Sequence, residues 1–75
     1  MEFNATFSMQ DTLKQAEAEK VKVTLRLRSG DALTGLIGAV ADHHLVLTYL
    51  VGREFFDALV RIDDISAVEV QVRKK

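Results

Sequence analysis

The spacing of apolar residues changes once along the chain, near residue 20. Before this point, apolar residues recur at the spacing of one face of an α-helix, at Met9, Leu13 and Ala16. Ser8 precedes Asp11 by three positions, the spacing of a capping box at a helix start. The pattern therefore predicts a helix at about residues 9–20, with a narrow apolar stripe that packs against the rest of the protein.

From Val21 onward the period becomes two, which indicates half-buried β-strands. We expect five strands, separated by short polar breaks, at residues 21–28, 32–41, 45–51, 54–62 and from 65 or 66 to 72. The last residues, Arg73, Lys74 and Lys75, are expected to form a solvated tail. Gly35 and Gly38 interrupt the second strand, and glycine inside a strand marks a bend or a close backbone approach.

Short turns between antiparallel strands, together with one sharply bent strand, are typical of a small barrel of the SH3-like or OB-like kind. We therefore predict a mostly β fold, in which an N-terminal helix is followed by a strongly bent five-stranded antiparallel barrel. The chain has 75 residues, which is enough for a single domain. Within residues 1–75, the helix is expected at about 9–20 and the barrel at about 21–72.

Composition restricts what this domain can do. It holds 10 Lys and Arg against 11 Asp and Glu, so any contact with nucleic acid must be a local patch rather than bulk attraction. There is no cysteine for a disulfide or for a cysteine-based zinc site. Hydrophobic residues make up 48% of the sequence, which is more than so short a chain buries alone. We therefore expect some apolar surface to lie between the subunits of a homo-oligomer.

The longest run of apolar or glycine residues covers 35–41, whereas a bilayer span needs ~20 residues. The first residues lack the basic and apolar regions of a signal peptide, so we expect a soluble, cytoplasmic protein. No nucleophile motif, glycine-rich phosphate loop or pair of carboxylates in a cleft is indicated. We accordingly expect neither an enzyme nor a bound cofactor.

Two segments resemble the sequence motifs of a known family. The stretch from Gly30 through Gly35 to Asp42 resembles the first motif of the Sm and Sm-like (LSm) family, which includes bacterial Hfq. Arg61 and Ile65 resemble residues of the second motif. In this chain, as in the family, a helix is expected before the first strand. The resemblance covers nearly the whole chain.

This resemblance implies a closed ring of about five to seven copies, in which the fourth strand of one subunit pairs with the fifth strand of the next. It also implies that the pore face binds single-stranded RNA, often rich in uridine, and that the protein acts as an RNA adaptor. The residues at the family's pocket positions are Asp42, His43, His44 and Arg61.

The residues themselves leave several roles open. The two histidines are either exposed turn residues, a pair that stacks on and hydrogen-bonds to bases, or ligands of a metal shared with Asp42 of several subunits. Asp42 is expected to accept backbone N–H bonds in its turn, or to orient a neighbouring His or Arg. Arg61 is expected to pair with one of the two aspartates that follow it or across a subunit interface, or else to stack on a base.

Other exposed positions have their own expected roles. A basic stripe on the first strand, formed by Lys22, Arg26 and Arg28, is either a solvated face or a track for phosphates. Phe55 and Phe56 point to opposite faces of the predicted fourth strand, so one is expected in the core and the other at a subunit interface. Tyr49 is expected at the edge of the core or at an interface.

Two other functions compete with RNA binding. The first is a structural or protein-interaction ring without an RNA site. It is favoured by the net charge of −1 and by Ile62 and Asp63, which replace the Lys-His pair of the bacterial members. The second is a monomeric SH3-like module with a peptide ligand, although a single Tyr and no Trp make a poor aromatic groove.

Overall fold

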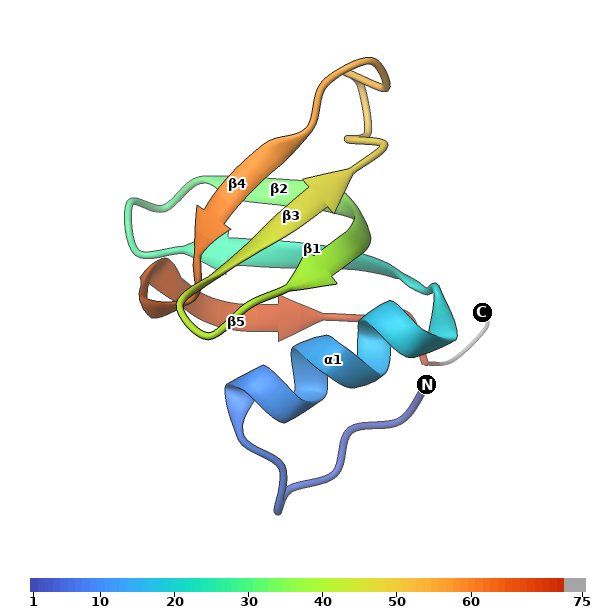
Figure 1. Cartoon of the computed structure of the whole chain (residues 1–75), viewed down its shortest axis with the longest axis vertical. Helices are drawn as coiled ribbons and strands as arrows, with labels where there is room; N and C mark the ends of the chain where they lie inside the picture. Colours follow the sequence, from blue (N-terminus) through green and yellow to red (C-terminus); the bar gives the residue numbers. More distant parts are fainter. Residues whose placement is uncertain (73–75) are drawn as a thin grey trace.

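A computed structural model describes residues 1–72, and in it one helix packs on a strongly curled five-stranded sheet (Figure 1). The elements are α1 (Met9–Glu19), β1 (Lys22–Leu27), β2 (Ala32–Val40), β3 (His44–Thr48), β4 (Ala58–Arg61), the 3-10 turn η1 (Ile62–Asp64) and β5 (Ile65–Glu69). The strand order is β4-β3-β2-β1-β5, and each neighbouring pair is antiparallel. The predicted helix and five antiparallel strands are thus confirmed, with β4 and β5 at the two edges of the sheet. The predicted tail lies outside the described residues.

The local signals at both ends of α1 are present in the structure. The Ser8 hydroxyl accepts the backbone N–H of Asp11 at 3.0 Å, and the Asp11 carboxylate accepts the N–H of Ser8 at 3.4 Å, which completes the capping box. The helix ends at Lys20, whose φ of 54° is left-handed. Leu13 and Ala16, on the predicted apolar stripe, are fully buried.

The core lies between α1 and the inner face of the curled sheet. Its buried members are Leu13, Ala16, Val23, Leu25, Ile37, Leu45, Leu47, Leu50, Val60 and Ile65. In β1 the buried residues alternate with exposed or half-buried ones, as the period of two predicts. At Gly35 β2 packs closely against the end of β3, since a Cβ there would lie 2.5 Å from the backbone oxygen of Thr48.

The connection between β3 and β4 differs from the prediction. Tyr49 has a left-handed φ of 50°, so β3 ends at Thr48 rather than at residue 51. Residues 50–57 then form tight turns, closed by bonds from the Arg53 N–H to the Leu50 oxygen and from the Phe56 N–H to the Arg53 oxygen. Residues 49–57 therefore form a projecting segment, at the top of Figure 1, and β4 begins at residue 58 rather than 54.

The expected core positions in this segment are wrong for the same reason, whereas the expected interface positions stay predictions. Phe55 is fully exposed and Phe56 is 58% exposed, so neither side chain lies in the core of the chain. Tyr49 is also exposed, at 66%. At the other edge, β5 pairs with β1 as far as Glu69 and ends there, three residues earlier than predicted.

In the described part of the chain, no helix has the length and apolarity needed to cross a membrane.

Candidate RNA-binding site

The turn between β2 and β3 presents two of the predicted site residues. The Ala41 N–H donates to the His44 oxygen at 2.8 Å, which leaves Asp42–His43 at the tip of a tight turn. The His43 backbone oxygen accepts the Ile62 N–H at 2.9 Å. The Gln10 side chain donates to the Ala41 oxygen at 3.0 Å. The turn is therefore anchored to both η1 and α1.

His44 and Arg61 lie directly opposite each other on β3 and β4. The Ile62 N–H donates to the His43 oxygen, one position along from Arg61 and His44 on their strands. His44 and Arg61 are therefore a non-hydrogen-bonded pair, the kind of pair whose side chains come closest. In such pairs the two Cβ atoms lie about 4.5–5.5 Å apart. The following pair, Leu45 and Val60, points into the core, so His44 and Arg61 point outward, where both are exposed.

The outward face continues with an apolar pair. Val46 lies opposite Leu59, which is 71% exposed. We call the four residues His44, Val46, Leu59 and Arg61 the outer strip. The strip combines an imidazole, a planar guanidinium and aliphatic side chains, which suits the stacking of an unpaired base beside a phosphate. Sequence reasoning missed Leu59, because it lies between the apolar residues Ala58 and Val60 and no polar alternation marks its side chain as outward.

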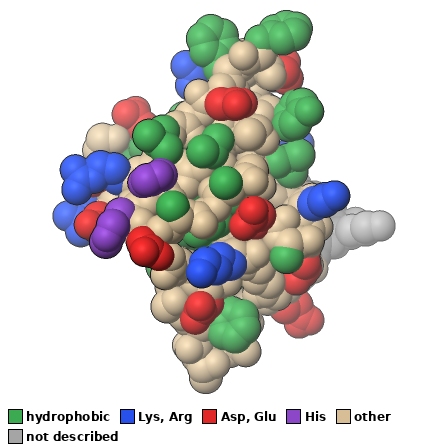
Figure 2. Space-filling view, in the orientation of Figure 1, with side chains coloured by type: hydrophobic (Ala, Val, Ile, Leu, Met, Phe, Trp, Pro, Cys, Tyr) green, Lys and Arg blue, Asp and Glu red, His purple; other side chains and the backbone are tan. Residues whose placement is uncertain are grey.

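The histidines lie close together on one side of the molecule, with basic and acidic side chains around them (Figure 2). Asp42, Asp63 and Asp64 are all exposed. Within residues 1–72, the Asp42 carboxylate accepts no hydrogen bond, so the predicted bonding within its turn is wrong. Arg61 forms no ion pair with a described residue, so the local bridge to the following aspartates is also absent. The guanidinium of Arg61 is therefore available to a ligand.

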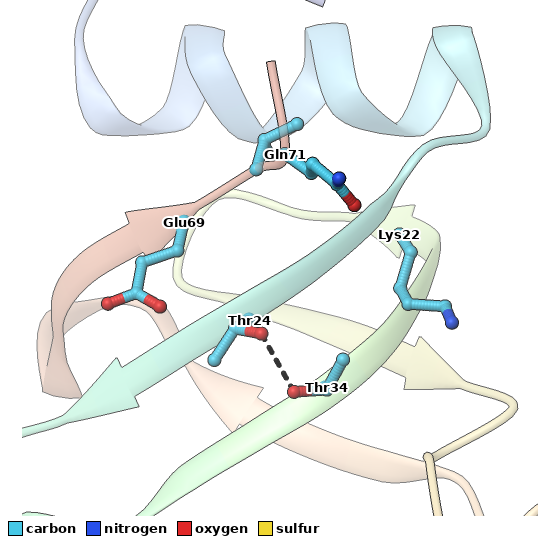
Figure 3. Close-up of a pocket in the computed structure, with 6 residues that line it drawn as sticks. Lys22, Thr24, Thr34, Glu69 and Gln71 are labelled. Carbon is cyan, nitrogen blue, oxygen red and sulfur yellow. Dashed lines mark hydrogen bonds between the residues drawn. The ribbon is translucent and has the colours of Figure 1, made fainter. Parts of the chain in front are cut away.

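The basic stripe of the first strand is not brought together with the outer strip, since β2 separates β1 from β3. The Arg26 guanidinium donates to the Glu69 carboxylate at 2.5 Å. This hydrogen bond, together with the negative charge of Glu69, raises the pKa of Arg26 above its usual value. Arg28 lies beyond the end of β1. Lys22 borders a hollow of about 400 Å³, which is also lined by Thr24, Thr34, Glu69, Val70 and Gln71 (Figure 3). One of the three cations is therefore already engaged by a carboxylate.

No group of three or more His, Cys, Asp or Glu side chains in residues 1–72 is placed to hold a metal ion. The interpretation in which several subunits share a metal through Asp42 and a histidine stays a prediction. In comparisons with known proteins, the sequence matches no protein-family model and no curated protein.

Proposed function

We propose that this chain assembles into an Sm-like ring and binds single-stranded RNA as an adaptor. The observation that carries this proposal is the outer strip, in which His44 lies opposite an unpaired Arg61 on an exposed face. A splayed base can stack on either planar group, and Arg61 can contact the adjacent phosphate. Stacking on such side chains contributes about 1–3 kcal/mol per base, so a few repeated sites suffice for binding.

Two features support self-association. The strands β4 and β5 each have one side without a strand partner among residues 1–72, and such edges favour pairing with another chain. Large apolar side chains remain exposed on β4 and on the segment before it, including Leu59 and Phe55. A ring of about five to seven copies, as the Sm-like resemblance implies, would cover these edges and repeat the outer strip around an axis.

One observation favours the alternative of a structural or protein-interaction ring. Asp42, Asp63 and Asp64 are exposed around the histidines, and their charges oppose the approach of phosphates. Under this alternative the ring persists and binds no RNA.

Fluorescence anisotropy with short oligo-uridine, oligo-adenosine and matching DNA tests the proposal at ~150 mM salt, where non-specific binding is weak. We expect RNA to bind preferentially, and His44→Ala or Arg61→Ala to weaken binding roughly tenfold, the size of one lost stacking contact. Lys14→Ala is the matched control for Arg61→Ala, because it removes one exposed positive charge from α1.

The outcomes separate the candidates. Preferential RNA binding that both substitutions leave unchanged would contradict the assignment of the outer strip. An assembled protein that binds none of the three strands would contradict RNA binding and favour the structural ring.

A further inference from the structure

The large exposed apolar side chains of residues 1–72 fall into two groups. One lies on the projecting segment and β4, and consists of Tyr49, Val51, Phe55, Phe56 and Leu59. The other lies near the two ends of the described chain, and consists of Phe3, Phe7, Met9 and Val72. Figure 2 shows hydrophobic side chains gathered at the projecting end. Each group borders one edge of the sheet, the first at β4 and the second at β5.

Phe3, Phe7 and Met9 of the second group line a shallow, open hollow. Its volume is about 260 Å³, and it is lined by Phe3, Phe7, Met9, Thr12 and Val68. Val68 comes from near the C-terminal end of β5, and Thr12 comes from α1. The hollow therefore lies between the N-terminal segment, the helix and the edge strand.

The N-terminal segment is held in place by its own contacts. It runs back along α1 (Figure 1), so that the Met1 amine lies 3.8 Å from the Glu19 carboxylate. The Asn4 side chain accepts the Thr6 N–H at 2.9 Å, and the Asn4 backbone oxygen accepts the Phe7 N–H at 3.0 Å. One wall of the hollow is thus preformed.

We infer that the projecting segment of one copy of this chain docks in the hollow of a second copy, with Phe55 and Phe56 packed against Phe3 and Phe7. This aromatic clasp rests on the proposed self-association and adds to it a contact outside the paired strands. The occupant is a second copy because the chain itself carries both surfaces, each beside an unpaired edge. Contact between two different patches of identical chains is heterologous, the kind that builds rings.

The surroundings of β5 fix the direction in which β4 of the first copy approaches it. Phe55 and Phe56 precede β4, so an antiparallel approach brings them to the C-terminal end of β5, where Val68 and the hollow lie. A parallel approach would bring them to the exposed carboxylates of Asp63 and Asp64.

The area of the clasp agrees with a contribution to a stable interface. Two phenylalanine side chains bury roughly 300–500 Å² at ~150–250 Å² each. A stable interface buries about 1,200–2,000 Å² in total, and the paired edge strands would supply the remainder.

The first test compares the wild-type chain with the double variant F55S/F56S by sedimentation velocity over a range of concentrations. Both side chains are exposed in the single chain, so circular dichroism should show an unchanged fold. We expect the double variant to need a roughly tenfold higher concentration to assemble, as is usual when buried aromatic anchors are removed. Equal assembly of the two proteins would overturn the clasp.

A second test measures the contact directly, since the chain has no cysteine of its own. Tagged F55C chains are mixed with untagged F3C chains under mild oxidation, and the mixed disulfide is identified by mass. The control replaces F3C by D31C, an exposed position in the β1–β2 turn. We expect a mixed disulfide with F3C in clear excess over that with D31C, and equal yields would overturn the clasp.

These experiments distinguish failure of the clasp from failure of the proposed function. If the wild-type chain assembles and binds RNA while F55S/F56S assembles equally well, the clasp is wrong and the RNA-binding ring stands. If the wild-type chain is a monomer at every concentration, self-association and the clasp are both wrong.

Discussion

At the scale of single residues, Gly35 occupies a position in the sheet that has no room for a side chain. It is buried in β2, opposite Val23 of β1, and the curled sheet brings β3 against its other side. A Cβ at this position would lie 2.5 Å from the Thr48 oxygen and 3.4 Å from the Tyr49 oxygen. Both atoms belong to the backbone, which cannot move without separating β3 from β2.

We expect Gly35→Ala to lower the free energy of unfolding by about 1–3 kcal/mol, the usual cost of overpacking. Gly38→Ala is the matched control on the same strand, because its Cβ would meet the Thr48 methyl group at 3.0 Å, and a side chain yields more easily than backbone. Urea denaturation at one protein concentration measures both variants. Equal losses would contradict the view that the close backbone packing at Gly35 restricts this position to glycine.

At the scale of elements, success in prediction depends on whether the signals are local. The sequence predicts the helix to within one residue because its cap and apolar stripe lie in or next to α1. It predicts the start of β4 four residues too early because Phe55 and Phe56 are of the residue types that favour strands. What excludes them from the sheet is the end of β3 at Tyr49, and no sequence signal marks an aromatic residue with positive φ.

The candidate site follows the same rule. The sequence Asp42-His43-His44 is a polar break between two predicted strands, and the structure places Asp42 and His43 in a turn and His44 at the start of β3. The opposition of His44 and Arg61 requires the register between β3 and β4, which depends on where the projecting segment ends. The exposed position of Leu59 depends on the same register, so sequence alone did not assemble the outer strip.

The end of α1 gives a prediction at this scale. Lys20 adopts φ 54° and ψ 43°, and its backbone N–H donates to the Ala16 and Glu17 oxygens. A left-handed conformation costs a non-glycine residue roughly 1–2 kcal/mol. We therefore expect Lys20→Gly to stabilise the protein by about 1 kcal/mol, as glycine is favoured in this position after a helix.

Lys20→Ala is the control for this substitution. It removes the same positive charge but keeps a Cβ, so no comparable gain is expected. Thermal and urea unfolding of the three proteins, at matched concentration, check the difference. A gain of similar size in both variants would assign the effect to the lost charge rather than to the backbone conformation.

At the scale of the whole molecule, apolar surface exceeds what one copy buries. Hydrophobic residues make up 48% of the chain, yet ten of them form the buried core of residues 1–72. The surplus is concentrated on the projecting segment and around the hollow, beside the two open edges of the sheet. With a net charge of −1, general repulsion between copies is weak, so this surface is free to drive association.

Association of this kind links stability to concentration, because binding to the folded state alone stabilises it by mass action. We expect the thermal midpoint of the wild-type chain to rise by several degrees between ~5 and ~500 µM protein. The F55S/F56S variant should show a smaller rise, since its weaker assembly stabilises the folded chain less at every concentration. A midpoint independent of concentration would contradict self-association. A rise of equal size in both proteins would agree with self-association but would show that the aromatic clasp does not contribute to it.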